Sequence, residues 1–412
     1  MSASDAATAA TADRAVTPPS APDDAATTPP SAPPAGYAWE ATDEQVAERY
    51  RLPPSAIVRF DLNTSPAPPD LALRALQSGS YGRPISEYPP SDYRGLVAAA
   101  AETYAVGPDE LLVGAGADEI LDLVAKAFLP PGAGAVIPTP TYAMYRVLTD
   151  QRPARPVLVP RRSAAAGYAI DVAAVRHAAR GAAVVWLCSP NNPTGLPEPA
   201  GSVAELLRGL LGDAEADRRV APVVVLDEAY AEFVGTSLVG LRDPYPRLVV
   251  VRTASKAYAL AGLRVGFAIG RRELIAKMAP YRPPGSVSIP SIAAVTAALG
   301  DPVALNDNVA RVSSERARLA AALAAIGIPA SPSVTNFLLV DLGDRERAAA
   351  AAEGLLRRGL VPRTFGAGHP LAGHLRFTVR APAEDDQLIA ALSEIVPAIP
   401  HPAPSAAQET LP

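Results

Sequence analysis

Short apolar runs alternate with helical stretches through the middle of this chain, and this alternation is its most constraining feature. Six apolar runs, several rich in β-branched residues, are separated by loops or by stretches whose apolar residues recur at helical spacing: Leu111–Val113, Ala135–Ile137, Ala182–Cys188, Pro222–Leu226, Leu248–Val251 and Val265–Ile269. Strands that are apolar throughout must be covered on both faces. The sequence therefore predicts an α/β fold in which a mostly parallel sheet lies between helices.

Changes in composition divide the chain into five predicted parts. The first is a disordered Ala/Pro-rich tail at residues 1–36, followed by an N-terminal segment at 37–84 that packs with a small domain. A large domain at 85–290 comes next, then the small C-terminal domain at 291–399 and a flexible tail at 400–412. The tails contain too few apolar side chains to offset the entropy lost on ordering. In the small domain, long Ala-rich helices surround two strands, Asn336–Asp341 and Leu375–Val379, which predicts a second α/β unit.

Charge and cysteine content exclude several classes of function. The chain has 37 Lys+Arg against 42 Asp+Glu, a net charge of −5, which argues against a nucleic-acid-binding protein. No run approaches the roughly 18 apolar residues of a membrane span, and the first residues do not resemble a secretory signal. Cys188 is the only cysteine, so we expect neither a disulfide framework nor a metal site. We expect a cytoplasmic protein that binds neither nucleic acid nor membrane.

Unusual polar residues follow several of the predicted strands. In parallel sheets, functional groups collect in the loops beyond the carboxyl ends of the strands. The segments in question are Ser189–Gly195 (Ser-Pro-Asn-Asn-Pro-Thr-Gly), Asp227–Tyr230, Arg252–Lys256 and Gly114–Glu119. The last of these opens a predicted helix, where free backbone N–H groups can bind a phosphate.

Lysine is rare in this chain, which narrows the search for an amine nucleophile to Lys126, Lys256 and Lys277. Lys126 and Lys277 lie on predicted amphipathic helices, which is typical of solvated side chains. Lys256 follows two hydroxyl residues in a loop of small residues, and Arg264 comes eight positions later. Such surroundings suit an amine with a lowered pKa that forms a Schiff base.

Asp227 closes an apolar strand, where an unpaired carboxylate is costly. It therefore needs a cationic partner. A protonated pyridine nitrogen is one such partner, and pairing would keep the ring an electron sink; a helix cap or a structural ion pair is the alternative. Tyr230 and Asn192 can both form hydrogen bonds with a phenolate oxygen on such a ring.

In this order and spacing, the motifs resemble those of the class I/II aminotransferases, the fold-type-I enzymes that depend on pyridoxal 5′-phosphate. The resemblance extends from about Asp61 to Ile395. Within the family the chain is most similar to histidinol-phosphate aminotransferases, in the segments Gly116–Glu119, Pro140–Tyr145 and Arg252–Gly266. The resemblance implies a cofactor-binding large domain with a mostly parallel seven-stranded sheet, plus a smaller α/β domain.

The resemblance also implies a role for each residue that matches the family's motifs. Lys256 would form the Schiff base and carry the proton during transamination, and Asp227 would keep the pyridine nitrogen protonated. Tyr230 and Asn192 would bind the ring oxygen, and Tyr142 would stack on the ring. The cofactor phosphate would be held by Thr253, Ser255, Arg264 and the backbone of Ala117 and Asp118.

Further matches concern the substrate and a second subunit. Tyr88, in Glu-Tyr-Pro-Pro, matches a tyrosine that reaches the phosphate from the partner subunit, which implies a homodimer. Arg376 matches the arginine that receives the substrate's anionic group, for which a planar guanidinium is well suited. Arg363 lies where the family has a second anion-binding arginine, with a surface charge as the alternative. Asn63 and Asn192 are also assigned to substrate binding.

The chain departs from the family pattern on the substrate side. The segment Leu62–Pro68 keeps Asn63 and loses the rest of the usual motif, and Thr378–Ala381 differs from the family's Thr-Val-Gly-Thr. His369 and His374 occur where the family has an aromatic stretch, and we interpret both as loop or packing residues. The cofactor motifs are intact, so the resemblance indicates the chemistry better than it indicates the substrate.

Several functions are compatible with these motifs. The leading hypothesis is amino transfer from L-histidinol phosphate to 2-oxoglutarate, in histidine biosynthesis. An aromatic or specialised-metabolite aminotransferase and a decarboxylase of a phosphorylated amino acid are alternatives, because a few pocket contacts decide substrate choice on a shared fold. A transcription regulator would need a DNA-binding domain, and residues 1–36 show no helical periodicity. A binding-only pseudoenzyme would be expected to lack the lysine or the aspartate.

Overall fold

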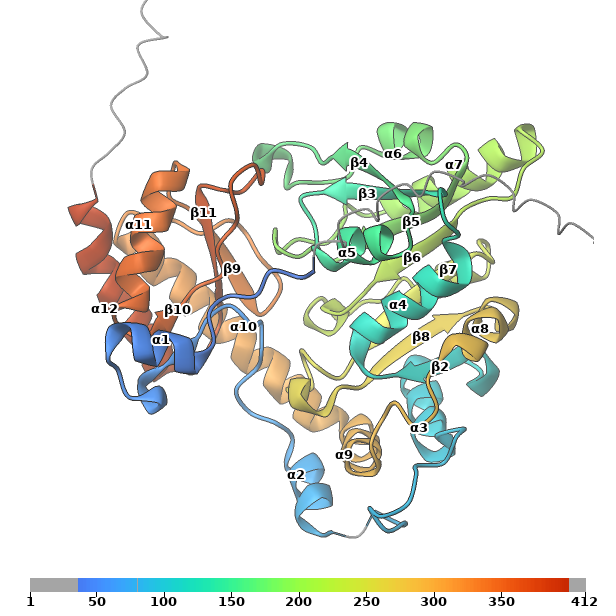
Figure 1. Ribbon diagram of the computed structural model, residues 1–412, viewed down its shortest axis with the longest axis horizontal. Coiled ribbons are helices and arrows are strands. Elements are labelled where there is room, and N and C mark those ends of the chain that lie inside the picture. The colour runs from blue at the N-terminus through green and yellow to red at the C-terminus, as the bar shows by residue number, and fades with distance from the viewer. Residues whose placement is uncertain (1–35, 80, 400–412) are drawn as a thin grey trace, which may run out of the picture. The chain divides into compact units, whose positions relative to one another are not determined.

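A seven-stranded sheet lies at the centre of the computed structural model, which describes residues 36–79 and 81–399 (Figure 1). In spatial order its strands are β2 (Leu111–Gly114), β8 (Gly266–Gly270), β7 (Leu248–Thr253), β6 (Val223–Asp227), β5 (Ala182–Cys188), β3 (Gly134–Thr139) and β4 (Arg155–Pro160). β8 is antiparallel to β2 and β7, and the other neighbours are parallel. The predicted α/β fold with a mostly parallel sheet is confirmed. The predicted tails fall outside the described residues, except for Gly36.

Helices cover both faces of this sheet because successive strand residues face opposite ways. In β6, Val223 and Val225 join one core cluster, whereas Val224 and Leu226 join the other. The first cluster also contains residues of α4 (Gly116–Phe128), α5 (Met144–Gln151) and α8 (Arg272–Met278). The second contains residues of α3 (Arg94–Tyr104), α6 (Val172–Ala178), α7 (Ser202–Ala216) and α9 (Ile289–Leu299). The uninterrupted apolar runs of the sequence thus correspond to strands buried on both sides.

The strand β4 is absent from the six apolar runs identified in the sequence. It begins with Arg155 and carries Pro156 and Pro160, which interrupt the apolar pattern. Because β4 is an edge strand, it has one unpaired side on which proline is tolerated. The same edge position leaves several of its side chains partly exposed.

A second core is built from the C-terminal elements and part of the N-terminal segment. Its elements are β9 (Phe337–Asp341), β11 (His374–Thr378), α10 (Pro302–Ala325), α11 (Arg345–Leu356) and α12 (Pro382–Ala398). β9 and β11 pair antiparallel, with Arg376 opposite Leu339. From the N-terminal segment, Phe60 enters this core, and β1 (Val58–Arg59) pairs with β10 (Leu360–Val361). The N-terminal segment of the described residues is therefore tied to the C-terminal elements.

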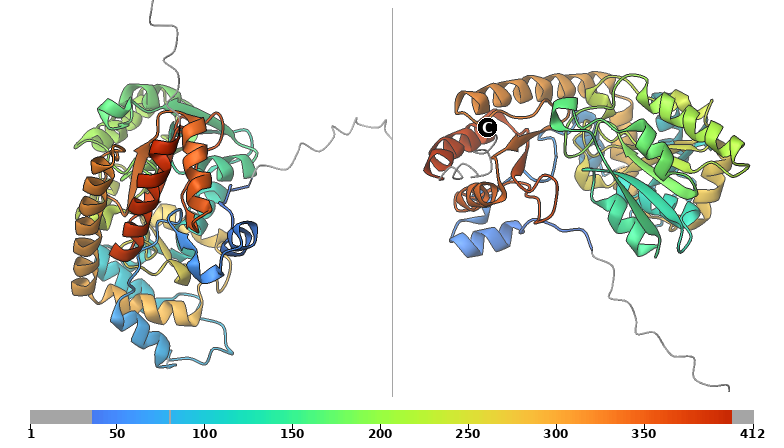
Figure 2. Two further views of the ribbon diagram at one scale, coloured as in Figure 1. Left: turned by 90° about the vertical axis from the view of Figure 1, so that its left-hand side faces the viewer. Right: turned by 90° about the horizontal axis from the view of Figure 1, so that it is seen from above.

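Two helices pack differently from the domain division expected from the sequence. The α2 helix (Asp70–Gln77) lies against α9 rather than against the C-terminal elements. The buried residues of α9 belong to a core cluster of the large sheet, so a boundary at residue 290 cuts through a helix of that sheet. The α10 helix follows and extends from α9 to the C-terminal elements, as Figure 2 shows. The physical reason is that Ile292, Ala294 and Val295 face apolar side chains of the large sheet's core.

Among the described residues, no single helix combines the length and apolar character needed to cross a membrane. The helices α9 and α10 meet that criterion only as a pair, and they are bent by 83° relative to each other.

The N-terminus of α4 differs from those of five other helices. In α1 (Asp43–Tyr50), α6, α9, α10 and α11, the side chain before the first turn accepts a backbone N–H. Residue Ala115 precedes α4 and has no such side chain. The first N–H groups of α4 are therefore available to another acceptor.

Candidate active site

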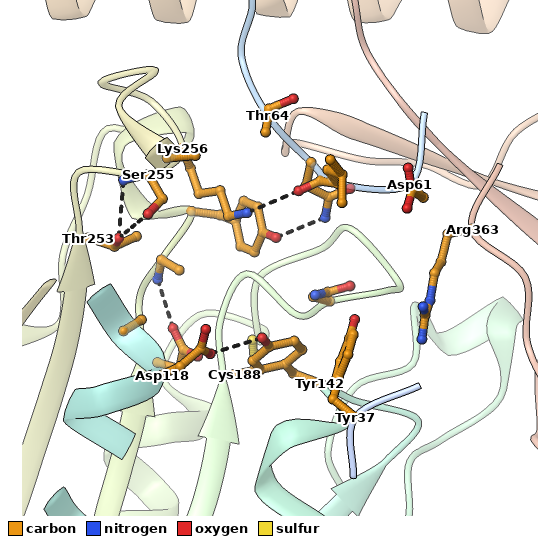
Figure 3. Close-up of a pocket in the computed structure, with 18 of the residues that line it drawn as sticks. Tyr37, Asp61, Thr64, Asp118, Tyr142, Cys188, Thr253, Ser255, Lys256 and Arg363 are labelled. Atoms are coloured by element: carbon orange, nitrogen blue, oxygen red, sulfur yellow. Dashed lines mark hydrogen bonds between the residues drawn. The ribbon is translucent and has the colours of Figure 1, made fainter. Parts of the chain in front are cut away.

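A cavity of about 460 Å³ lies beyond the carboxyl ends of β5, β6 and β7 (Figure 3). Its walls come from the N-terminal segment, the start of α4, the loops after these strands and the C-terminal strands. The following predicted site residues line it: Asn63, Ala117, Asp118, Tyr142, Asn192, Asp227, Tyr230, Thr253, Ser255, Lys256, Arg264, Arg363 and Arg376. The structure thus brings together every predicted site residue except Tyr88.

Tyr88 lies on the surface, with 85% of its area exposed, and it does not line the cavity of its own chain. This position fits the prediction that Tyr88 acts in the site of another subunit.

Asp227 is the last residue of β6 and is held from two directions. Its Oδ2 accepts a hydrogen bond from the Tyr145 hydroxyl at 2.8 Å, and its Oδ1 accepts one from the backbone N–H of Ala229 at 3.0 Å. Burial raises the pKa of this carboxyl to about 6. Among the described residues, no Lys, Arg or His lies within ion-pair distance of Asp227. The cationic partner expected from the sequence is therefore not a side chain of the described residues, and the protonated ring nitrogen of a ligand is a group that fits this position.

Lys256 points into the cavity with its amine near neutral groups. Its Nζ donates to the backbone carbonyl of Leu62 at 3.4 Å and lies 5.8 Å from the centre of the Tyr230 ring. Burial, and next the positive charge of Arg376, lower the pKa of this amine to about 8. A substantial fraction of neutral amine near physiological pH is what a nucleophilic lysine requires.

Three kinds of hydrogen-bond donor converge where the cofactor phosphate is predicted. The hydroxyls of Thr253 and Ser255 lie 2.9 Å apart after β7. The guanidinium of Arg264 forms an ion pair with Asp118 at 3.3 Å, beside the uncapped first turn of α4. Backbone N–H, hydroxyl and guanidinium groups are the donors that phosphates bind in proteins.

The shape of this cradle depends on two glycines. Gly116 has φ +82°, and a Cβ there would lie 2.5 Å from Nη2 of Arg264. A Cβ at Gly266 would lie 2.4 Å from the backbone of Gly116. Any larger residue at either position would displace the turn or the guanidinium.

Tyr142 forms one wall of the cavity. Its hydroxyl donates to Oδ1 of Asp118 at 2.9 Å, and its ring meets the ring of Tyr145 edge to face, with centroids 5.7 Å apart. The aromatic face is thereby fixed in the position where the sequence predicts ring stacking.

Asn63 and Asn192 connect the predicted cofactor residues to the C-terminal strands. The Asn63 side-chain amide donates to the Tyr230 hydroxyl at 2.9 Å, and the Asn63 backbone N–H donates to Oγ1 of Thr378 at 2.9 Å. The Oδ1 of Asn192 accepts a hydrogen bond from Nη1 of Arg376 at 2.6 Å. Burial raises the pKa of the Tyr230 hydroxyl, so this group stays protonated and can donate.

Arg363 and Arg376 lie directly opposite each other across an antiparallel bridge. Each backbone N–H donates to the other's carbonyl at 3.0 Å. Opposite residues of an antiparallel pair have side chains on the same face, and both guanidiniums line the cavity. The Nε of Arg376 is buried and has no hydrogen-bond partner among the described residues. Two guanidiniums from opposite positions of one bridge therefore line the cavity, and this is a group that suits anions.

Residues 37–40 contribute to the site but were not identified in the sequence. Tyr37 and Trp39 line the cavity, and the guanidinium of Arg363 lies 5.2 Å above the Tyr37 ring and donates to the Ala38 carbonyl at 2.8 Å. One oxygen of Glu40 accepts the backbone N–H of Thr364 at 2.8 Å and its hydroxyl at 2.9 Å. A signal was available, because residues 1–36 contain no aromatic side chain and these two aromatics follow at once.

The remaining candidate side chains lie outside the cavity. The His369 ring stacks on Phe365 with centroids 4.9 Å apart, and His374 starts β11 with its Nε2 3.8 Å from Asp341. Lys126 forms an ion pair with Asp122 on α4 at 2.6 Å. In the part of the chain that the structure describes, no group of His, Cys, Asp and Glu side chains could hold a metal ion.

The fold and the cavity together define a class of protein: a lysine with a lowered pKa, a buried carboxylate and the uncapped start of a helix lie at the carboxyl edge of a seven-stranded α/β sheet. The chain belongs to the aminotransferase class I and II family, which matches residues 58–395. It is an aminotransferase that depends on pyridoxal 5′-phosphate and acts on amino and 2-oxo acid substrates.

Individual relatives narrow the comparison within this family. The chain is 37% identical over 360 residues to a histidinol-phosphate aminotransferase from Roseiflexus castenholzii, covering 85% of this chain and 93% of the relative. It is 38% identical to one from Thermococcus gammatolerans, covering 72% and 79%. Among solved structures, histidinol-phosphate aminotransferase from Sinorhizobium meliloti in complex with pyridoxal-5′-phosphate superposes with a TM-score of 0.78 at 26% identity, covering 87% of this chain and 95% of that one.

The side chains of this cavity fit pyridoxal 5′-phosphate. Asp227 is a buried carboxylate without a cation, Lys256 is an amine with a lowered pKa, and the first turn of α4 has free N–H groups next to Arg264. These are the three kinds of group needed for the ring nitrogen, the aldehyde and the phosphate of the cofactor. When bound, the protonated ring of the cofactor withdraws electrons from the carbon that bears the amino group.

Proposed function

We propose that this enzyme transfers the amino group of L-histidinol phosphate to 2-oxoglutarate, giving imidazole-acetol phosphate and L-glutamate. The observation that carries this proposal is the pairing of Arg363 with Arg376 on one wall of the cavity. The amino donor brings a phosphate and the acceptor brings a second carboxylate, and guanidinium pairs suit both anions. The three relatives described above, which are named histidinol-phosphate aminotransferases, support the same substrate.

We assign the proton transfers to Lys256. Its Nζ would hold the cofactor until an amino donor displaced it, and the freed amine would then take a proton from the substrate carbon as a general base and return it to a cofactor carbon as a general acid. The lowered pKa of this amine supports the role, since a fully protonated lysine could not accept the proton.

The remaining side chains position the cofactor and the substrate. Asp227 pairs with the ring nitrogen, and Tyr230 and Asn192 donate hydrogen bonds to the ring oxygen. Tyr142 stacks on the ring. The phosphate is held by Thr253, Ser255, Arg264 and the backbone of Ala117 and Asp118. Asn63 orients Tyr230 through the hydrogen bond that joins them.

A single-turnover experiment tests the substrate. Cofactor-loaded protein is mixed in turn with L-histidinol phosphate, L-phenylalanine and O-phospho-L-threonine, and the visible absorbance of the bound cofactor is followed. We expect it to change with L-histidinol phosphate alone and to recover with 2-oxoglutarate. A response to phenylalanine but not to L-histidinol phosphate would support an aromatic aminotransferase instead, and release of carbon dioxide from O-phosphothreonine would support a decarboxylase.

We further propose that the enzyme is a cytoplasmic homodimer in which Tyr88 reaches the cofactor phosphate of the partner subunit. Large apolar side chains are exposed around it, with Ile85 74% and Tyr281 47% exposed. Burying these side chains against a second copy would remove apolar area from water. The cytoplasmic location follows from the proposed substrates, since doubly charged metabolites cross a bilayer poorly.

Hybrid dimers test the assignment of Tyr88. Tyr88→Ala and Lys256→Ala proteins are each expected to be nearly inactive. Mixing them after partial denaturation restores activity if Tyr88 acts across the interface, because one site of each hybrid dimer then carries neither change. If both residues served the same subunit's site, no mixture would recover activity. Light scattering establishes the oligomeric state of each variant.

A further inference from the structure

Tyr145 lies directly behind the cavity and has no role in the function described so far. It ends the segment Pro140–Tyr145, one of the segments on which the family resemblance rests, and it lies in α5. Its side chain is fully buried and does not line the cavity, so it cannot touch a substrate. Its partners are instead two of the residues assigned to the cofactor.

The first partner is Asp227. The Tyr145 hydroxyl donates to Oδ2 at 2.8 Å, while the backbone N–H of Ala229 donates to Oδ1 at 3.0 Å. Each carboxylate oxygen therefore receives one hydrogen bond from a fixed donor. Together these bonds define the plane of the carboxylate and leave its other lone pairs for a ligand.

The second partner is Tyr142, whose ring is assigned to stack on the cofactor. The Tyr145 ring meets it edge to face, at a centroid distance of 5.7 Å and an angle of 88°. One buried side chain thus contacts both the residue beneath the predicted ring nitrogen and the residue against the predicted ring face.

Tyr145 is itself held in place by two neighbouring side chains, Trp186 and Thr149, which also contact each other. Its ring stacks on Trp186 at 5.5 Å with an angle of 4°. The Trp186 Nε1–H donates to Oγ1 of Thr149 at 3.2 Å, and the Thr149 hydroxyl donates to the Tyr145 carbonyl at 2.7 Å. All three side chains are fully buried, so the hydroxyl of Tyr145 is held in one direction.

The charge of Asp227 depends on this arrangement. Burial raises the pKa of the carboxyl, and the Tyr145 hydroxyl opposes that shift because a hydrogen bond to the ionised form stabilises it. The titratable groups facing Asp227 come from several elements: Asp118 of α4, Cys188 of β5, Tyr230 after β6 and Lys256 after β7. A further facing group is Tyr145 of α5, and among the described residues its side chain is the one that donates a hydrogen bond to Asp227.

We propose that Tyr145 is a positioning residue that keeps Asp227 ionised and aimed at the cofactor's ring nitrogen and holds Tyr142 against the cofactor's ring. The proposal rests on the roles assigned above to Asp227 and Tyr142, and it is independent of which amine is the substrate.

The test compares Tyr145→Phe with Tyr245→Phe. Tyr245 is a matched control, because it is also buried and its hydroxyl also donates at 2.8 Å, but to the backbone carbonyl of Pro222, away from the cavity. Affinity of the cofactor-free proteins for pyridoxal 5′-phosphate is measured by equilibrium dialysis. The pH dependence of the bound cofactor's absorbance is measured without substrate, and the melting temperature of each cofactor-free protein is recorded.

We expect Tyr145→Phe to bind the cofactor about tenfold more weakly, the effect of losing one hydrogen bond to a charged group, and to shift the absorbance titration. Tyr245→Phe should change neither quantity, although both variants lose some thermal stability. Equal cofactor affinity and equal titration curves in the two variants would overturn the proposal and leave Tyr145 a packing residue. Failure of L-histidinol phosphate to react with the unaltered enzyme would count against the proposed substrate only.

Discussion

Lys256 and Lys126 show how strongly surroundings decide what a lysine does. Lys126 is partly exposed and paired with Asp122 one turn earlier on α4, whereas Lys256 lies in the cavity with no carboxylate at ion-pair distance among the described residues. Burial and the nearby Arg376 lower the pKa of Lys256 to about 8, and the charges of Asp118 and Asp227 offset this only in part. The same residue type is a solvated charge in one place and a nucleophile in the other.

Lys256→Ala is therefore expected to lower kcat by at least about a thousandfold, in the upper range for loss of a general acid–base group. The variant should also lose the absorbance of the covalently bound cofactor. Lys126→Ala removes a lysine of α4 that does not line the cavity, and it should leave both kcat and the absorbance unchanged. Steady-state kinetics and absorbance spectra of the two variants check this; equal losses would mean that the amine of Lys256 has no special role.

Asp385 is a buried carboxyl remote from the cavity, and it makes stability depend on pH. Burial, together with a hydrogen bond that the protonated carboxyl donates to Glu315, raises its pKa to about 8. Because the folded pKa is above the unfolded value of 3.8, the stabilisation is complete below about pH 4 and is lost as pH rises toward 8. Asp385→Asn resembles the protonated form at every pH.

We expect Asp385→Asn to melt close to the unaltered protein at pH 5 and above it at pH 9. The reason is that, at high pH, the buried Asp385 carboxyl of the unaltered protein must either carry a charge or hold a proton that the unfolded chain would release. Both alternatives lower the free energy of unfolding. Thermal melts across this range measure the difference. A constant offset at all pH values would show that Asp385 does not titrate within it.

At the scale of elements, the segment Tyr37–Glu40 closes one side of the cavity mouth. Glu40 holds it to Thr364, and Arg363 holds it at the Ala38 carbonyl. Both anchors lie next to β11, the strand that carries Arg376. The position of this short segment is thus coupled to the arginine pair.

Glu40→Ala should release this segment by removing two hydrogen bonds. We expect KM for the amino donor to rise by up to about thirtyfold with little change in kcat, since the two bonds contribute about 1 kcal/mol each. Glu48→Ala, an exposed position on α1, is the control. Tryptophan fluorescence anisotropy gives a second measure. Trp186 is buried and Trp39 is exposed, so a change in anisotropy would report greater motion of Trp39. An unchanged KM and anisotropy would show that Glu40 does not hold the segment.

The elements and the site were predictable from the sequence to different degrees. Strands such as β6 were identified because both faces are apolar, whereas β4 was missed because Pro156 and Pro160 break its pattern. The cofactor residues were found because they follow strands in recognisable motifs. The bridge between Arg363 and Arg376 was not, because residue spacing along the chain does not specify pairing within the small sheet.

At the scale of the whole molecule, the cofactor is expected to act as a stabilising ligand. The cavity joins both cores, so a bound group that contacts the large sheet and the C-terminal strands favours only the folded state. At a cofactor concentration about 100 times Kd, the gain is about 2.7 kcal/mol.

Removal of the cofactor should lower the melting temperature by several degrees, and the effect should grow with cofactor concentration. Lys256→Ala should show a smaller gain, because it retains the phosphate cradle but not the covalent attachment. Thermal melts at several concentrations check this. Coincident melts with and without cofactor would show that the cavity does not bind it.

The hydrogen bond between Asn63 and Thr378 joins positions 315 residues apart. A chain made from its N-terminus therefore presents Asn63 long before its partner exists, and the loop between them must close last. The binding site therefore cannot be assembled on a ribosome until residues 374–378 have emerged. A chain cut short before β11 would thus retain all seven strands of the large sheet but no activity.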